Sequence, residues 1–264
     1  MTAAVGTNKP RALVLFDVDG TLTESGEQCP APMLDALSQL CSLPNVDLGV
    51  VGGGSLEKIR WQLRDATCFR WLFAENGLVT GDGLVHESLR SAVPEAEIQH
   101  AIDLCLSWIA ATRLPFKRGK FVDFRNGLFY VTPIGSQCNR AERERFARLD
   151  ASHGFRLKLL RQLRSDQRFA QHFECLLGGQ LGVAVYPCGF DKTYCLRHLD
   201  ASQTTYERIF FVGDRCNRNG NDYPLYASPR TIAFETNGPQ RTMQLLRSQI
   251  VPRLGTDGST ATHA

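Results

Sequence analysis

Two hydrophobic patterns alternate along most of the chain. The first is a short run of consecutive apolar residues, which is typical of a strand buried on both faces of a parallel sheet. Runs of this kind occupy residues 13–16, 46–51, 71–74, 209–212 and 231–236. The second pattern has apolar residues at helical spacing, as in Met33, Leu34, Leu37 and Leu40. Strands that alternate with helices predict an α/β fold with a right-handed parallel sheet, whose chemistry lies at the carboxyl ends of the strands.

The middle of the chain has a different pattern from about Leu84 onwards. Residues 94–110 carry a helical apolar stripe, and the charged segment 141–164 is also expected to be helical. Two pairs of apolar runs, at 120–131 and 173–186, turn at Asn-Gly and Gly-Gly pairs, which predicts two hairpins. Antiparallel strands and helices between the halves of a parallel sheet predict an inserted α+β cap domain that closes over the core and excludes water.

These patterns predict the division of the chain into domains. The core is expected in two parts, residues 1–84 and 187–252, with the cap domain at 85–186 between them. The small and polar residues of 253–264 are expected to form a disordered tail.

Two aspartates follow the first apolar run and organise the candidate chemistry. In an extended chain Asp17 and Asp19 point to the same side, and two like charges that close need a cation between them. Oxygen ligands suit Mg²⁺, and a metal-shielded carboxylate can attack phosphorus to give an aspartyl-phosphate. We therefore expect Asp17 to be the nucleophile, Asp19 to be the acid/base, and both to hold the metal. The alternative is an ordinary Asp-Gly turn at a strand end.

A glycine-rich turn after the second run suggests a phosphate site. Gly52-Gly53-Gly54-Ser55 lies between a predicted strand and a predicted helix, where backbone N–H groups and the helix N-terminus favour an anion. The alternative is that Ser55 only caps the helix.

Four segments in order resemble motifs of the haloacid dehalogenase (HAD) superfamily of phosphotransferases. Asp17 to Thr21 resembles the first motif, DxDGT, and the glycine turn the second. Pro187 to Lys192 resembles the third motif, and Gly213-Asp214 with Gly220-Asn221-Asp222 resembles the fourth, GDxxxxxGND. With Glu75-Asn76-Gly77, which is similar to an ENG signature, the resemblance narrows to the eukaryotic-type phosphomannomutases and covers about Arg11 to Arg247. It implies a HAD-like Rossmannoid parallel-sheet core with an inserted α+β cap domain of the C2 type.

The resemblance also implies an activity and its residues. Such an enzyme interconverts mannose 6-phosphate and mannose 1-phosphate through an aspartyl-phosphate and a hexose 1,6-bisphosphate, which feeds GDP-mannose synthesis and protein glycosylation. Lys192 would stabilise the phosphorylated aspartate, and Asp214, Asn221 and Asp222 would complete the Mg²⁺ site. Ser55, Arg125 and Arg143 would bind the substrate, because a guanidinium grips phosphate with two hydrogen bonds. Members of the family are cytosolic homodimers joined through the cap, so we expect the same here.

The chain departs from this family at its substrate contacts. Gly26 and Ser136 stand where the family has arginines, Gly182 and Ala184 where it has Ser and Asp, and Gly54 where it has Ser. Losing one charged hydrogen bond typically costs about 1.5–3 kcal/mol, so binding of the distal phosphate should weaken. A Mg²⁺-dependent sugar-phosphate phosphatase and a catalytically idle homologue therefore remain alternatives, and the preference between mannose and glucose is open. Lys120, Arg140 and Arg145 are candidates to replace the missing arginines.

Composition narrows the class of partner. A net charge of +3 on 264 residues is too small to indicate nucleic acid or a membrane surface. Residues 1–10 lack the apolar centre of a signal peptide, and no apolar run approaches the roughly 20 residues of a membrane span. Nine cysteines without a Cys-x-x-Cys pair are typical of reduced core thiols rather than of a metal site. We expect a cytoplasmic enzyme acting on a small molecule.

Overall fold

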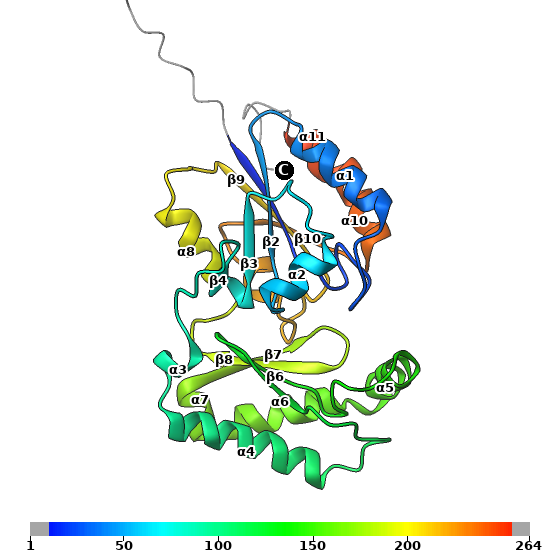
Figure 1. Cartoon of the computed structure of the whole chain (residues 1–264), viewed down its shortest axis with the longest axis vertical. Coiled ribbons are helices and arrows are strands. Elements are labelled where there is room, and N and C mark those ends of the chain that lie inside the picture. The colour runs from blue at the N-terminus through cyan, green and yellow to red at the C-terminus, as the bar shows by residue number, and fades with distance from the viewer. Residues whose placement is uncertain (1–10, 255–264) are drawn as a thin grey trace, which may run out of the picture.

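The five apolar runs form five strands of a six-stranded sheet in the computed structural model, which describes residues 11–254 (Figure 1). The sixth is a short edge strand that the sequence did not predict. The strand order is β10-β9-β1-β2-β3-β4, and every neighbouring pair is parallel except β3 with β4. The strands are β1 (Ala12–Phe16), β2 (Val46–Val51), β3 (Trp71–Ala74), β4 (Val79–Thr80), β9 (Arg208–Gly213) and β10 (Ile232–Glu235). The predicted parallel α/β core is confirmed.

Helices cover both faces of this core sheet, because alternate residues of each strand point to opposite sides. Val14 and Phe16 pack with α1, α2 and α10, whereas Leu13 and Leu15 pack with α8 and α9. The core helices are α1 (Ala31–Cys41), α2 (Leu56–Gln62), η1 (Glu75–Gly77), α8 (Tyr194–Ala201), α9 (Tyr223–Tyr226), α10 (Pro239–Leu245), η2 (Leu246–Ile250) and α11 (Val251–Leu254). The strand ends that carry the aspartates are therefore fixed between two packed layers.

A second, antiparallel sheet lies between the core and a layer of helices (Figure 1). Its order is β5-β6-β8-β7, and α4, α6 and α7 pack on the face that points away from the core. The elements are α3 (Leu89–Ala92), α4 (Glu95–Ala111), β5 (Val122–Phe124), β6 (Phe129–Val131), α5 (Arg140–His153), α6 (Phe155–Ser165), α7 (Gln167–His172), β7 (Phe173–Gly178) and β8 (Gly182–Pro187). We call this part the cap.

Residues 141–164 are helical, as expected, but they form two helices, α5 and α6, instead of one. Gly154, at φ 62° and ψ 39°, ends α5 and begins α6. The Asp150 carboxylate fixes the break by accepting hydrogen bonds from the Arg156 backbone N–H at 2.8 Å and from its Nε at 2.7 Å. The turn lets the two helices bury their apolar faces in different clusters, Phe146 of α5 in one and Leu159 of α6 in the other.

The cap is bonded to the core at two places that flank the candidate site. The Glu75 carboxylate of the core accepts hydrogen bonds from the backbone N–H of Gly127 at 2.7 Å and the side-chain amide of Asn126 at 3.2 Å. On the other side, Leu177 of β7 donates to the Asn219 carbonyl at 2.7 Å and accepts from the Asn221 N–H at 3.1 Å. The cap is thus held against η1 on one side and against the loop that carries the fourth motif on the other.

The predicted domain limits at 84/85 and 186/187 stay predictions, although the cap sheet ends with β8 at Pro187. Arg253 and Leu254, expected in the tail, belong to α11. The rest of that tail and the segment 1–10 lie outside the described residues. Among residues 11–254, no helix combines the length and the apolarity that crossing a membrane requires.

Candidate active site

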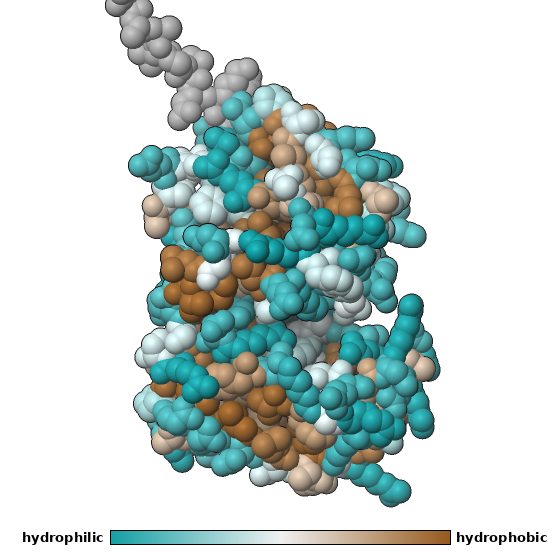
Figure 2. Space-filling model, in the orientation of Figure 1, coloured by the Kyte–Doolittle hydropathy of each residue, from teal (hydrophilic) through white to brown (hydrophobic). Residues whose placement is uncertain are grey.

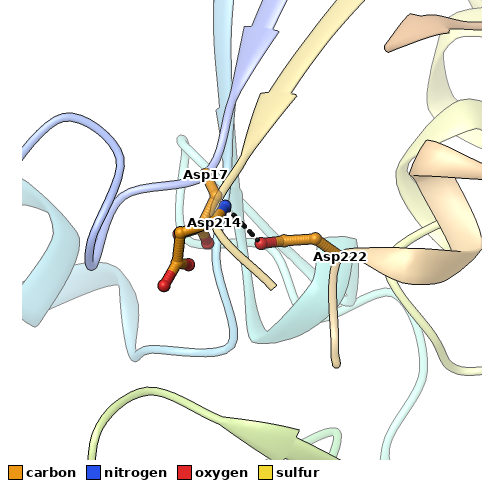
Figure 3. A group of neighbouring side chains, drawn as sticks. All are labelled: Asp17, Asp214 and Asp222. Carbon is orange, nitrogen blue, oxygen red and sulfur yellow. Dashed lines mark hydrogen bonds between the residues drawn. The ribbon is translucent and has the colours of Figure 1, made fainter. Parts of the chain in front are cut away.

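Three carboxylates converge at the carboxyl ends of the core strands (Figure 3). Asp17 follows β1, Asp214 follows β9, and Asp222 lies at the start of α9. One carboxylate oxygen of each residue lies within 4.8 Å of the others. Asp222 Oδ2 accepts the backbone N–H groups of Asp214 at 3.0 Å and Arg215 at 2.9 Å, which folds the fourth-motif loop around it. The parallel sheet thus gathers acids that are far apart in the sequence.

A buried lysine joins two of these acids. The Lys192 ammonium donates to Asp17 Oδ1 and, at 2.6 Å, to Asp222 Oδ1, and Lys192 is only 1% exposed. Burial alone would lower the pKa of this ammonium, but the charges of Asp17 and Asp222 raise it above the usual value of lysine. Lys192 is therefore charged. Both carboxylate oxygens of Asp222 accept hydrogen bonds, one from Lys192 and the other from backbone N–H groups.

Asp17 and Asp214 have the charge and the surroundings to hold a divalent cation. Burial, followed by the charges of Asp222 and Asp214, raises the pKa of Asp17, and Lys192 opposes the shift. Burial and the charge of Asp222 raise the pKa of Asp214 to about 7. A Cβ at Gly20 would lie 2.6 Å from Asp214 Oδ2, so only glycine leaves room for this carboxylate. Closely spaced carboxylates repel one another, and a hard cation bound between them removes this repulsion. The residues present therefore fit such an ion.

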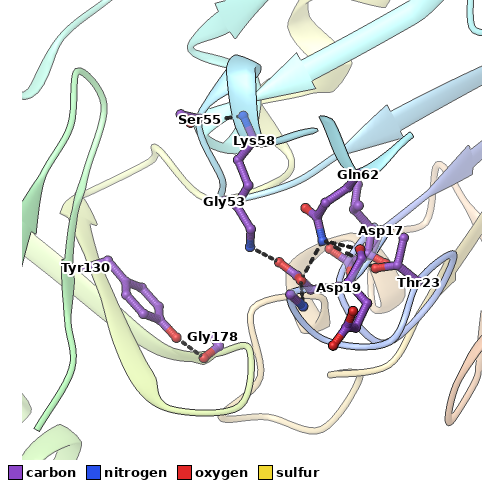
Figure 4. Close-up of polar contacts among 12 residues, drawn as sticks. Asp17, Asp19, Thr23, Gly53, Ser55, Lys58, Gln62, Tyr130 and Gly178 are labelled. Atoms are coloured by element: carbon purple, nitrogen blue, oxygen red, sulfur yellow. Dashed lines mark hydrogen bonds and ion pairs between the residues drawn. The ribbon is translucent and has the colours of Figure 1, made fainter. Parts of the chain in front are cut away.

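Asp19 is bonded to donors that do not contact this acidic group (Figure 4). The Asp19 carboxylate accepts hydrogen bonds from the ammonium of Lys58, from the side-chain amide of Gln62 at 2.8 Å and from the N–H of Gly26 at 2.7 Å. Burial alone would raise the pKa of Asp19, but Lys58 and the other two donors lower it. Asp19 and Asn221 both line the cavity, but neither belongs to the acidic group of Asp17, Asp214 and Asp222. Their roles as metal ligands stay predictions.

Lys58 and Gln62 are site residues that the sequence interpretation missed. Both lie on α2, four positions apart and therefore on one face of the helix. Two polar residues four positions apart, directly after a glycine turn, were the sequence signal that could have identified them as site residues.

Ser55 is placed as a helix cap. Its hydroxyl accepts the backbone N–H of Lys58 at 3.3 Å at the start of α2. Gly52, Gly53 and Gly54 line the cavity beside it, whereas Ser55 does not. The structure therefore does not bring Ser55 to the substrate space, and the glycine backbone faces that space instead.

A cavity of about 370 Å³ separates the aspartates from the cap sheet. Arg125 and Arg143, which were predicted to bind the substrate, both line it from the cap side. Arg125 donates to Asp123 Oδ2 at 2.8 Å and to the carbonyl of Gly53 on the glycine turn. Arg143 Nε donates to the Cys138 carbonyl at 2.9 Å. The cavity thus has an acidic, metal-fitting end and a cationic end.

Of the three candidates to replace missing arginines, Lys120 alone lines the cavity, where it forms an ion pair with Asp123 at 2.8 Å. Arg140 instead pairs with Glu144 at 3.1 Å, and Arg145 lies over the ring of Phe116.

An aromatic ring occupies the wall where Gly182 and Ala184 replace polar residues. The Tyr130 hydroxyl donates to the Gly178 carbonyl (Figure 4). A Cβ at Gly182 would lie 2.6 Å from the Tyr130 ring and 2.5 Å from the Val131 carbonyl oxygen. Tyr130 was not predicted as a site residue, because an alternating position in a hairpin does not reveal which face meets the cavity.

We expect Gly182→Ala to lower the free energy of unfolding by about 1–3 kcal/mol, because the added methyl group overlaps the Val131 backbone. Gly178→Ala is the matched control, since Gly178 pairs with Gly182 across the hairpin and the atoms nearest to its Cβ would belong to side chains, Tyr130 Cε2 at 3.1 Å and Ala184 Cβ at 3.8 Å. Urea unfolding of both variants measures the difference. Equal losses would contradict the backbone clash.

Known sequences match the chain over most of its length. The profile of the eukaryotic phosphomannomutase family matches residues 33–251. A phosphomannomutase of Arabidopsis thaliana is 38% identical over 240 residues, which are 89% of this chain and 94% of that protein. Phosphomannomutase 1 of Homo sapiens is 37% identical over 264 residues, covering 96% of this chain and 97% of that protein.

Solved structures show the same fold at low sequence identity. An N-terminally truncated IMP-nucleotidase of Plasmodium falciparum superposes with a TM-score of 0.62 at 14% identity, over 91% of this chain and 71% of that one. A haloacid dehalogenase-like hydrolase of Bacteroides thetaiotaomicron gives a TM-score of 0.52 at 14% identity, over 82% and 85% of the two chains. The predicted HAD-like core is confirmed.

Proposed function

Because the chain belongs to the eukaryotic phosphomannomutase family, we propose that it interconverts mannose 6-phosphate and mannose 1-phosphate. It is an isomerase that works by phosphoryl transfer on a hexose phosphate. The observation that carries the proposal is the joint presence of the acidic group, Lys192 and two cap arginines around one cavity. The choice of mannose as the sugar rests on family membership, and the choice of phosphoryl transfer as the reaction rests on this arrangement of residues.

Asp17 is the proposed nucleophile. Its carboxylate forms a bond to phosphorus, and the bond from phosphorus to the sugar oxygen breaks, which leaves an aspartyl-phosphate. The Lys192 ammonium bonds Asp17 Oδ1 and Asp222 Oδ1. Its positive charge therefore offsets the negative charge that the phosphoryl group brings. The phosphoryl group then passes to the free hydroxyl of a hexose monophosphate, which forms the hexose 1,6-bisphosphate and regenerates Asp17.

Asp19 is the proposed acid/base. It lines the cavity beside Asp17, and the lowered pKa keeps it ionised in the resting enzyme. An ionised carboxylate can accept the proton of the hydroxyl that attacks phosphorus and return it to the oxygen that leaves in the opposite direction.

We propose Mg²⁺ as the metal, held by Asp17 and Asp214, with Asp19, Asn221 and Asp222 around it. When bound, this ion shields the negative charges that meet during phosphoryl transfer. The pKa of Asp214 is raised to about 7 although Arg215 Nε lies 3.1 Å from its Oδ2, and this crowding of Asp17 and Asp214 supports the choice of a hard divalent cation.

The cap end of the cavity is proposed to hold the second phosphate of hexose 1,6-bisphosphate, which serves as activator and intermediate. Arg125, Arg143 and Lys120 supply the positive charge there. A bisphosphate that releases, turns over and rebinds then presents either phosphate to Asp17, which is how one nucleophile serves both positions of the sugar.

The wider assignments rest mainly on the family. We propose a role in GDP-mannose synthesis for protein glycosylation and a cytoplasmic location, which the nine free cysteines support because thiols persist in reducing compartments. We also propose a homodimer joined through the cap. Apolar residues gather over the lower part of the cap, around α4 (Figure 2), and Leu106 of α4 is 40% exposed.

The activity test follows mannose 6-phosphate formed from mannose 1-phosphate and a trace of hexose 1,6-bisphosphate. With Mg²⁺ we expect turnover, and chelation of the metal with EDTA is expected to lower the rate at least about 100-fold, because the two acids then repel the phosphate. Parallel reactions with glucose 1-phosphate compare the sugars. Turnover that survives EDTA, and is not raised by added Mg²⁺, would contradict the proposed metal.

A further inference from the structure

The Asp19 carboxylate lines the cavity, does not belong to the acidic group, and accepts hydrogen bonds from three donors. We propose that Lys58 and Gln62 are positioning residues, which hold this carboxylate in the orientation needed for proton transfer. The inference rests on the proposed function, since it assigns the partners of the acid/base in that reaction.

Three donors from two segments fix the carboxylate (Figure 4). Gln62 Nε2 and the Gly26 N–H both bond Oδ1, at 2.8 and 2.7 Å, and Lys58 bonds Oδ2. Because each oxygen has its own donor, rotation of the carboxylate about its bond to Cβ breaks at least one contact. The orientation is therefore set by the protein before any substrate binds.

The two side chains stand on a rigid support. Helix α2 is capped by Ser55 and buries Ile59 in the core, at 1% exposure. The Lys58 stem passes over the glycine turn, where a Cβ at Gly54 would lie 3.4 Å from Lys58 Cδ. The absence of a side chain at position 54 thus leaves a path for Lys58 across the turn to Asp19.

Gln62 ties the loop after β1 to the same point. Its side chain is buried, at 1% exposure, and its amide also contacts the Thr23 hydroxyl at 3.3 Å and the Glu27 carbonyl at 3.4 Å. The Cys29 N–H donates to the Gln62 backbone carbonyl at 2.7 Å. The loop that supplies the Gly26 donor is therefore ordered by the residue that also bonds Asp19.

The arrangement predicts an effect that depends on the leaving group. A sugar oxygen needs a proton when its bond to phosphorus breaks, whereas p-nitrophenolate is a weak base and leaves without one. Removing Lys58 should therefore slow transfer from a hexose phosphate much more than transfer from p-nitrophenyl phosphate. A residue needed only for folding would slow both equally.

The experiment compares Lys58→Met, Lys58→Arg and Gln62→Leu with Arg60→Met, an exposed neighbour on α2 whose guanidinium bonds the Gly81 carbonyl. For the mutase reaction we expect Lys58→Met and Gln62→Leu to lower kcat about 100-fold with KM within about threefold, and Lys58→Arg to recover most of kcat. The burst of p-nitrophenolate that accompanies Asp17 phosphorylation should change less than about threefold.

Two results would overturn the inference. An equal loss on both substrates would indicate a structural role, and a raised KM with unchanged kcat would mean that Lys58 binds the substrate phosphate instead. The kcat and KM of the mutase reaction decide this even where the burst is small. Failure of the proposed function is recognised separately, because the unsubstituted protein would then form no mannose 6-phosphate.

Discussion

Lys192→Met is expected to lower the free energy of unfolding by about 3–5 kcal/mol, the cost typical of removing one partner from a buried ion pair. The ammonium is the cation that bonds both Asp17 and Asp222, and the side chains of all three are at most 7% exposed. Methionine fills a similar volume but leaves two buried carboxylates facing each other and Asp214. The same variant should lose phosphoryl transfer, because nothing then offsets the charge on phosphorylated Asp17.

Urea unfolding in EDTA measures this loss, since a bound metal ion would replace part of the missing charge. Lys58→Met is the matched control, because its ammonium also bonds an aspartate but its side chain is 40% exposed. Exposed pairs contribute about 0–1 kcal/mol, so the control should lose far less. A Lys192→Met protein as stable as the control would contradict the view that this ion pair organises the site.

Asp17→Asn is expected to lower mutase activity by about 10⁴-fold or more, because an amide cannot form the acyl-phosphate bond. The substitution preserves shape, and an amide oxygen can still accept a hydrogen bond from Lys192. It also removes one of three crowded negative charges, so we expect its unfolding free energy to change by less than about 1 kcal/mol.

Intact-mass measurement after incubation with hexose 1,6-bisphosphate separates the two roles of Asp17. The unsubstituted protein should gain one phosphoryl group, and Asp17→Asn should gain none while keeping a normal urea transition. A folded Asp17→Asn protein that is still phosphorylated would assign the nucleophile elsewhere.

The core and its acids were predictable because their signals are local. Asp17 and Asp214 each end an apolar run, and parallel strands bring their carboxyl ends to one edge whatever the connections between them. Lys192 was found through the family motif, whereas its burial between Asp17 and Asp222 depends on packing that the sequence does not display.

What the sequence did not reveal depends on long-range packing. The segment 141–164 was expected to be helical, but its pattern did not reveal the break at Gly154, which lets α5 and α6 fill two different clusters. Lys58 and Gln62 are ordinary polar residues of an amphipathic helix until Asp19 is placed beside them. A serine directly after a glycine turn is typical of a phosphate ligand, but the backbone N–H groups at the start of α2 compete for the Ser55 hydroxyl.

The departures at the cap wall follow the same logic. Gly182 and Ala184 looked like lost contacts in the sequence, yet Tyr130 fills the space in front of them and Lys120 lines the cavity nearby. Across the cleft, a Cβ at Gly26 would lie 4.0 Å from Arg143 Nη1, so an arginine at position 26 would bring a second cation close to the first.

The most direct test follows the fate of phosphorus by ³¹P NMR, with the protein, Mg²⁺, mannose 1-phosphate and a trace of hexose 1,6-bisphosphate. A mutase moves the phosphoryl group to the other oxygen of the sugar, so we predict that a mannose 6-phosphate signal grows while inorganic phosphate stays at its starting level. Inorganic phosphate as the main product would mean that water reaches phosphorylated Asp17 and that the chain is a phosphatase, which would contradict the proposed function.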